Sequence, residues 1–135
     1  MTGVLVLVGT LVLATVAGLV MKSRNGRVRT TSASNLPPDV QAVLSPGKVT
    51  LVQLSTVFCA PCRHTRVLLS DLASRTDGLH HTELDLTERP ELAKELSVLR
   101  TPTTLAIDRS GTEILRVGGV PRRDRLLAAL RPHLT

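Results

Sequence analysis

Aromatic side chains are almost absent from this sequence of 135 residues. Phe58 is the only one, and there is neither Trp nor Tyr. Proteins that bind RNA or single-stranded DNA stack the bases on aromatic rings, so this scarcity argues against that class. The core must instead be built from Leu, Val, Ile and Ala, which supply most of the 42% of hydrophobic residues.

Cysteine is also scarce, with two residues in the chain. Two are too few for a small secreted domain held by several disulfides, or for a zinc site made of four cysteines. A zinc site of two cysteines and two histidines is an alternative with suitable ligand types but an unusual spacing, built from Cys59, Cys62, His64 and either His80 or His81. The sequence predicts no metal site.

Charged side chains are missing from residues 1–21, and Gly3–Met21 is an uncharged, mostly apolar run of 19 residues. A helix rises about 1.5 Å per residue, so this run would be roughly 28 Å long, close to the thickness of the hydrocarbon core of a bilayer. The sequence therefore predicts a transmembrane helix that anchors the chain through residues 3–21. A cleaved signal sequence is the alternative, since Thr15–Ala17 forms a weak cleavage site.

Basic residues give the chain a formal net charge of +6, a value typical of nucleic-acid-binding proteins. Four of these charges, however, directly follow the apolar run, at Lys22, Arg24, Arg27 and Arg29. Residues 30–135 carry 13 basic and 11 acidic side chains and are close to neutral. By the positive-inside rule, we expect a single-pass protein of the cell membrane with a cytoplasmic domain. Because the excess charge lies beside the apolar run, we expect no nucleic-acid partner. An extracytoplasmic domain is the alternative.

The residues after the apolar run predict a linker and one α/β domain. Thr30–Pro38 is small, polar and ends in two prolines, which is typical of a flexible linker. The predicted organisation is a transmembrane anchor (1–21), a basic juxtamembrane segment and linker (22–38) and a domain (39–135). Strands are predicted over 48–54, 79–86, 103–108 and 112–117, and helices over 39–44, 60–75, 87–96 and 121–130. Val67, Leu68 and Leu72 mark the predicted buried face of the second of these helices. This order predicts a sheet with helices on both faces.

The two cysteines stand in the run Phe58-Cys59-Ala60-Pro61-Cys62-Arg63, where a predicted strand ends and a helix begins. Free N–H groups and the macrodipole at a helix start stabilise an anion, which is expected to lower the pKa of the Cys59 thiol. Cys62 follows one turn later, within reach of a disulfide with Cys59. Such a pair can attack a substrate disulfide through Cys59 and be released from the mixed disulfide through Cys62.

Residues 40–130 resemble a domain of the thioredoxin family. The Cys59–Cys62 run is similar to the Cys-Gly-Pro-Cys active site of that family, and Thr101–Thr103 is similar to its conserved loop with a cis-proline. The predicted hairpin and Gly118-Gly119 before the last helix match the end of the family's domain. The resemblance implies an α/β thioredoxin-like fold, a central mixed sheet flanked by helices, here preceded by one N-terminal transmembrane helix.

The same resemblance implies roles for individual residues. Cys59 would be the catalytic nucleophile and Cys62 the catalytic resolving thiol. Their redox-active disulfide would take the place of a cofactor. Substrate binding would involve five neighbouring residues: Phe58, Ala60, Pro61, Thr101 and Pro102. Pro102 would be the cis-proline.

The sequence departs from the family pattern at three positions. Phe58 stands where Trp is usual, Gln53 where a buried Asp is usual, and Glu83 where Lys is usual. Gln cannot take a proton, so the base that normally assists Cys62 is missing. We hypothesise that Glu83 supplies a substitute carboxylate for proton transfer. The first strand of the family fold is also hard to find between Thr30 and Gly47, which predicts an abbreviated amino-terminal edge.

Together these features predict an enzyme, a membrane-tethered thiol–disulfide oxidoreductase that reduces disulfides. Its partners would be disulfide-containing proteins and either a thioredoxin-reductase-like or a membrane electron donor. One alternative is an outward-facing exchanger that acts on secreted or cytochrome-maturation substrates. Another is a redox-silent membrane adaptor with a thioredoxin fold, because fold alone does not fix function.

Overall fold

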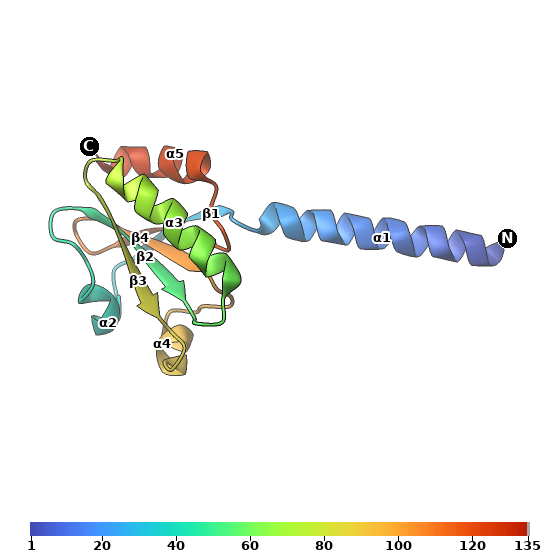
Figure 1. Ribbon diagram of the computed structural model, residues 1–135, viewed down its shortest axis with the longest axis horizontal. Helices are drawn as coiled ribbons and strands as arrows, with labels where there is room; N and C mark the ends of the chain where they lie inside the picture. The colour runs from blue at the N-terminus through green and yellow to red at the C-terminus, as the bar shows by residue number, and fades with distance from the viewer. Residues whose placement is uncertain (135) are drawn as a thin grey trace.

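A computed structural model describes residues 1–134 (Figure 1). Its single sheet has five strands: β1 (Val28–Ala33), β2 (Val49–Ser55), β3 (Leu79–Asp85), β4 (Thr103–Ile107) and β5 (Glu113–Gly118). The helices are α1 (Thr2–Arg24), α2 (Pro38–Gln41), α3 (Ala60–Ser74), α4 (Pro90–Glu95) and α5 (Arg123–Leu134). The strand order is β1-β5-β4-β2-β3, with β2 and β3 parallel and the other pairs antiparallel. This mixed sheet flanked by helices confirms the predicted fold.

Strand β2 lies at the centre of the fold and is buried along its whole length. Successive side chains of a strand point to opposite faces, so β2 contributes to two separate cores. On one face, Val49 and Leu51 pack with α3 and α5, whose core residues are Leu69, Leu72, Leu126 and Leu130. On the other, Val52 and Leu54 pack with Val40 of α2, Leu92 of α4 and Leu96, which follows α4 directly. Gln53 follows Leu51 by two residues and therefore faces α3.

The buried face of α3 differs from the predicted one. The sequence places Val67 in the core, but its exposed fraction is 65%. The buried residues of α3 are Cys62, Thr65, Leu69 and Leu72. These recur every three or four residues as a helix face requires, but two of them are small or polar, which hides the stripe in the sequence.

Strand β1 occupies part of the segment that the sequence predicts to be a linker. It pairs antiparallel with β5, placing Thr30 opposite Leu115. The β-branched side chains of Val28, Thr30 and Thr31 favour an extended backbone, and most of the strand is exposed because it forms the edge of the sheet. The linker prediction is therefore wrong for Thr30–Ala33. Among residues 1–134 the sheet has no strand beyond β3, and the abbreviated amino-terminal edge stays a prediction.

Helix α1 extends away from the rest of the chain (Figure 1), and none of its residues is buried. It is long and apolar enough to cross a membrane, a property that it shares with signal sequences at the same end of a chain. The carboxyl end of α1 carries Lys22 and Arg24, two of the four basic residues that follow the apolar run.

Only Asn25–Arg27 separate α1 from β1, and this junction is packed against the domain. The N–H of Gly26 donates to the carbonyl of Gly118 over 2.8 Å. Gly119 has a φ of 85°, in the left-handed region that favours glycine, and a Cβ atom there would overlap the Asn25 side chain. The end of α1 is therefore joined to the domain without a flexible spacer.

Candidate active site

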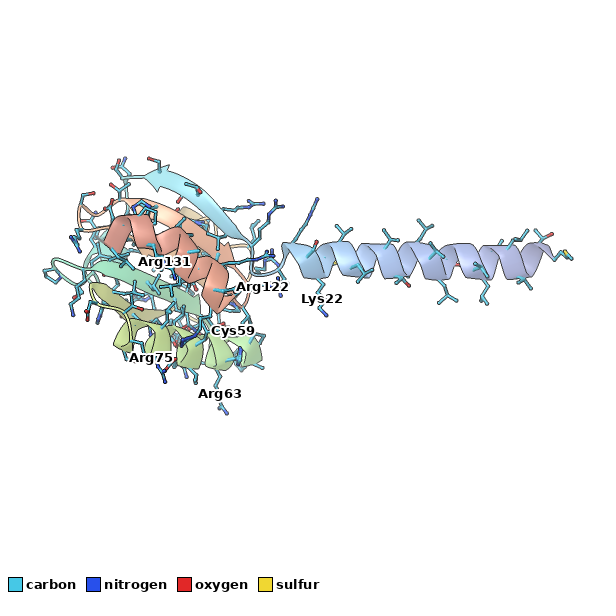
Figure 2. All side chains as sticks on the ribbon, turned by 90° about the horizontal axis from the view of Figure 1, so that it is seen from above. Lys22, Cys59, Arg63, Arg75, Arg122 and Arg131 are labelled. Carbon is cyan, nitrogen blue, oxygen red and sulfur yellow. A yellow bond between two sulfur atoms is a disulfide. The ribbon has the colours of Figure 1, made fainter. Side chains whose placement is uncertain are left out.

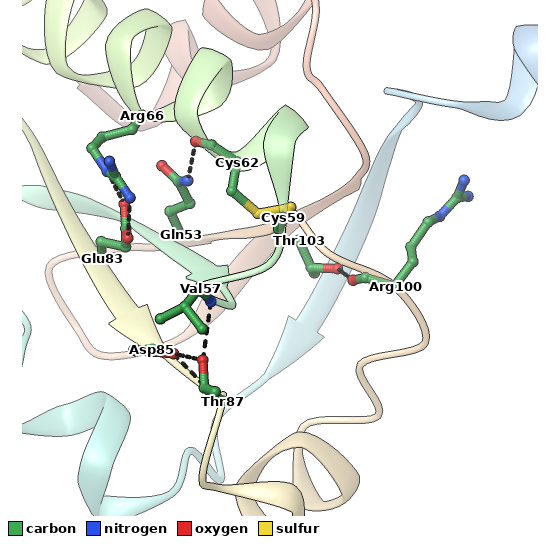
Figure 3. Close-up of a disulfide and its surroundings, with 10 residues drawn as sticks. All are labelled: Gln53, Val57, Cys59, Cys62, Arg66, Glu83, Asp85, Thr87, Arg100 and Thr103. Atoms are coloured by element: carbon green, nitrogen blue, oxygen red, sulfur yellow. Dashed lines mark hydrogen bonds and ion pairs between the residues drawn. A yellow bond between two sulfur atoms is a disulfide. The ribbon is translucent and has the colours of Figure 1, made fainter.

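Cys59 and Cys62 form a disulfide where β2 leads into α3 (Figure 3), with their Cα atoms 5.3 Å apart. Cys59 is the N-cap residue of α3 and has an extended backbone, while Pro61 lies in the first helical turn. Proline fits the first turn because its missing N–H would have no partner there. The structure thus brings the two sulfurs together at the strand-to-helix junction that the sequence predicts.

The two cysteines differ in their access to solvent. The exposed fraction of Cys62 is 1%, because its side chain points beneath α3. Cys59 is partly exposed, and the neighbouring Phe58 has an exposed fraction of 92%. Of the two cysteines, Cys59 is therefore the one that lies at the surface.

The loop before β4 lies beside the disulfide and contains a cis peptide bond between Thr101 and Pro102, as the resemblance implies. The carbonyl of Pro102 accepts a hydrogen bond from the N–H of Gly119 over 2.7 Å. The hydroxyl of Thr103 donates to the carbonyl of Arg100 over 2.6 Å. These two bonds fix the loop between β4 and the end of β5.

The structure groups three of the five predicted substrate-binding residues around one groove. Pro61, Thr101 and Pro102 line a groove of about 510 Å³. Phe58 instead lines a separate hollow between the loop before α3 and the end of β3. Ala60 is the first residue of α3 and is exposed.

A polar network that the sequence did not predict lies directly beneath Cys62. The amide nitrogen of the buried Gln53 side chain donates to the carbonyl of Cys62 over 2.9 Å (Figure 3). Its Oε1 atom lies 3.1 Å from Nε2 of His81, whose Nδ1 lies 3.4 Å from the hydroxyl of Ser70. An amide oxygen only accepts hydrogen bonds, so Nε2 of His81 carries the hydrogen in this contact. Burial also lowers the pKa of His81, which favours the neutral ring.

Glu83 lies next to this network, opposite Gln53 in the pairing of β2 with β3. Its carboxylate accepts two hydrogen bonds from Arg66, over 2.5 Å from Nε and 2.8 Å from Nη2 (Figure 3). Hydrogen bonding from Arg66 lowers the pKa of Glu83. A proton on this carboxyl would therefore compete with the guanidinium, and the proton-transfer role of Glu83 stays a prediction.

The Glu83 pairing predicts a pH-dependent contribution to stability. We expect Glu83→Gln to lower the free energy of unfolding by at most about 1 kcal/mol at pH 7, because Arg66 is about half exposed to solvent. A carboxyl whose pKa is lowered by folding stabilises the protein above its unfolded pKa, and this contribution is lost as the pH falls through the folded pKa. The difference in the free energy of unfolding between Glu83→Gln and the unchanged protein should therefore become smaller at acidic pH.

Pulse proteolysis across a urea series, at neutral and at acidic pH, measures this difference. Glu88→Gln is the matched control, since Glu88 is exposed and forms no ion pair among residues 1–134. A constant difference at every pH would contradict the assignment of the stabilisation to the ion pair.

The zinc alternative concerns the same two sulfurs. Zinc binds cysteines as thiolates, whereas Cys59 and Cys62 are here joined to each other. Within residues 1–134, no group of three or more His, Cys, Asp and Glu side chains is arranged to hold a metal ion.

Comparison with known proteins supports the fold and the family. The sequence model of the Thioredoxin family matches residues 29–132. Thioredoxin H5 of Oryza sativa subsp. japonica is 27% identical over 89 residues, which cover 66% of this chain and 66% of that protein. The bifunctional thioredoxin reductase/thioredoxin of Mycobacterium leprae (strain TN) is 32% identical over 89 residues, covering 65% of this chain and 19% of that protein.

The chain therefore spans just under two thirds of the rice protein and about a fifth of the mycobacterial one. Among solved structures, a mutant thioredoxin from Halobacterium salinarum NRC-1 superposes with a TM-score of 0.63 at 21% sequence identity, over 78% of this chain and 96% of that one. This likeness shows the fold. Since the family model matches well over half of the chain, the protein belongs to the thioredoxin family.

Proposed function

We propose that the chain is a thiol–disulfide oxidoreductase that reduces disulfides in other proteins. The observation that carries this proposal is the pairing of a partly exposed Cys59 with a buried Cys62 at the start of α3. The exposed sulfur can meet a substrate, and the buried one can act only on a sulfur already bonded to Cys59. The names of the thioredoxin relatives agree with this activity.

The reaction transfers two electrons from the reduced pair to the substrate. The Cys59 thiolate attacks one sulfur of the substrate disulfide, and the other substrate sulfur leaves as a thiolate that takes a proton from solvent. Cys62, as a thiolate, then attacks the Cys59 sulfur and breaks the mixed disulfide. The second substrate thiolate leaves, and the Cys59–Cys62 disulfide seen in the structure is the oxidised product.

The surroundings of the pair support these steps. Cys59 precedes the first turn of α3, where unpaired N–H groups and the helix dipole stabilise its thiolate. The groove at Thr101 and Pro102 would hold the substrate as an extended segment through backbone contacts. Exposed Phe58 and Ala60 would contact the substrate from the other side of Cys59.

Reduction of insulin by the full chain in detergent tests the activity, with dithiothreitol as the electron source. Turnover faster than that of dithiothreitol alone is the expected result. A rate no faster than the reagent alone would contradict the proposal and favour the redox-silent adaptor.

We infer that the physiological electron donor resembles thioredoxin reductase. The name of the Mycobacterium leprae relative joins such a reductase to a thioredoxin in one protein. A purified thioredoxin reductase with its reductant should convert the Cys59–Cys62 disulfide to two thiols that react with maleimide. If maleimide labels the cysteines after treatment with dithiothreitol but not after treatment with the reductase, the membrane electron donor is the better candidate.

We also propose that α1 spans the membrane and anchors the domain. Its length, its apolar composition and its fully exposed side chains support this. We expect Leu11→Arg, at mid-helix, to cost about 3 kcal/mol of insertion free energy and to shift the chain into the fraction extracted by alkaline carbonate. Val67→Arg is the matched control, since Val67 is an exposed apolar residue of the domain. Equal extraction of the two variants would argue against a membrane-spanning α1.

The basic residues after α1 support a cytoplasmic domain. Labelling of Ser34→Cys in intact cells tests this side, because Ser34 is exposed and lies outside the strands. Cys59 and Cys62 are changed to serine in the same chain so that only the new thiol reacts. Complete protection from an impermeant maleimide is the expected result. Ready labelling would overturn it and favour the outward-facing exchanger.

A further inference from the structure

The groove beside the disulfide is not formed by the domain alone. Part of its lining consists of Pro61, Thr101 and Pro102, which belong to the start of α3 and the cis-proline loop. The lining also includes Met21 and Lys22, which lie in the last turn of α1. The proposed substrate groove therefore lies against the end of the membrane-spanning helix.

The junction after α1 holds the end of this helix in place. The Gly26 N–H donates to the Gly118 carbonyl, and Asn25 packs on Gly119 and accepts a longer hydrogen bond from Arg100 over 3.4 Å. Gly119 in turn donates to the carbonyl of Pro102, and both residues line the groove. These contacts connect the helix end to the cis-proline loop through adjacent residues, so the distance between them is fixed.

The length of α1 sets the position of the groove relative to the membrane surface. An apolar run of 19 residues matches the hydrocarbon core, and Met21 is its last residue. Asn25 follows four residues later, which at about 1.5 Å per residue is roughly 6 Å along the axis. The headgroup region on one side of a bilayer is about 5–8 Å thick. The groove would thus open within or just beyond the headgroup layer.

Arginines surround the same end of the domain. A second groove of about 630 Å³ is lined by five of them, and no acidic residue lines it: Arg24, Arg27, Arg29, Arg100 and Arg116. Arg100 lines both grooves. Figure 2 shows Lys22 and Arg122 on either side of the place where α1 meets the domain. Arg116 is paired with Glu113, whereas the other four lining arginines form no ion pair among residues 1–134. Guanidinium groups bind anionic headgroups, so these four would hold this face of the domain against the membrane surface.

We propose that the substrate is a membrane protein whose disulfide lies in a juxtamembrane segment, within the headgroup layer. This proposal rests on the proposed oxidoreductase activity and membrane anchor. A disulfide close to its own transmembrane span reaches the groove by diffusion in the plane of the membrane. A disulfide held far above the membrane surface reaches the groove rarely, because the groove faces the headgroups. Such a disulfide is reduced slowly.

Proteoliposomes that contain the full chain and a model substrate test this proposal. Each substrate is a single-pass peptide with one disulfide loop, placed either directly after the span or beyond a helical spacer of about 40 residues, which is about 60 Å long. With the chain reduced beforehand, single-turnover reduction of the near loop should be at least about tenfold faster. Equal rates for the two loops would overturn the proposal.

A flexible insertion identifies the α1 junction as the cause of this preference. Ten Gly and Ser residues between Asn25 and Gly26 free the domain from the helix, and the near-to-far ratio should then fall toward one. The same ten residues between Ser110 and Gly111 are the matched control, because this hairpin turn lies at the other end of β4 and β5. The control should keep the preference. An unchanged ratio after the first insertion would contradict the role of the junction.

Two further readouts separate this inference from the proposals on which it rests. Flotation with the liposomes reports the membrane anchor, and reduction of a small soluble aromatic disulfide reports the redox activity and the folding of each insertion variant. If either is absent from the unchanged chain, the proposed function itself fails. If both are present and the loops react equally, the juxtamembrane substrate alone is wrong.

Discussion

Replacing Cys59 with serine is expected to lower the rate of insulin reduction by at least about a thousandfold, the scale of loss seen when an enzyme loses its nucleophile. Cys59 is partly exposed to solvent, while Cys62 is 1% exposed. A serine hydroxyl is not ionised near neutral pH, and an alkoxide does not replace a thiolate in disulfide exchange. The measurement is the initial rate of insulin reduction by Cys59→Ser, with the rate of dithiothreitol alone subtracted.

Cys62→Ser is the matched control, since it removes the other half of the same disulfide. Its Cys59 can still attack, so the substrate should remain attached through a mixed disulfide that appears on a non-reducing gel and disappears on reduction. Cys59→Ser should trap no such species. Mixed disulfide on Cys62 in Cys59→Ser, or no mixed disulfide on Cys59 in Cys62→Ser, would contradict the assignment of Cys59 as nucleophile.

The parts of the site that follow from short spacings could be predicted from the sequence. Two cysteines three residues apart at a strand-to-helix junction lie within reach of a disulfide, and a helix begins directly after Cys59. The Thr101–Thr103 loop is identified by its resemblance to a family motif, and it lies beside the disulfide as that motif implies. Local chain geometry decides these features, so they require no knowledge of distant contacts.

The network beneath Cys62 depends on contacts between distant residues and could not be predicted in the same way. Gln53 and His81 lie on neighbouring strands, and their contact depends on the register of β2 and β3, which pairs Gln53 with Glu83. The sequence indicates that at most one of His80 and His81 faces inward, because they alternate along a strand. It does not indicate which partner that histidine meets.

The prediction for the amino-terminal segment is wrong for a related reason. Thr30–Ala33 is polar enough to resemble a linker, and it becomes a strand because β5 offers it an open edge. Gly26 and Gly119 likewise have positive φ values that matter only once the α1 junction packs on the loop after β5. Local composition cannot report such pairings, and the position of the groove relative to the membrane depends on them.

Gln53→Ala is expected to lower the free energy of unfolding by about 3–4 kcal/mol. The side chain is fully buried, so truncation leaves a cavity. It also removes the hydrogen bond to the carbonyl of Cys62 and the contact with Nε2 of His81. A buried polar group that loses its partner costs about 1–3 kcal/mol. Pulse proteolysis of the full chain in detergent, across a urea series, gives this free energy without an aromatic reporter, which the domain lacks apart from Phe58.

Gln53→Leu separates the two causes, because leucine fills most of the same volume but makes no hydrogen bond. We expect it to cost about 2 kcal/mol, less than Gln53→Ala, since the polar groups lose their partner but no large cavity remains. The hydrogen bond to the Cys62 carbonyl also positions the first turn of α3, so both variants should resolve a preformed mixed disulfide more slowly. A Gln53→Leu protein that is as stable as the unchanged chain would show that only the volume of the side chain matters for stability at this position. If it also resolves the mixed disulfide as fast, the network has no part in holding Cys62 against Cys59.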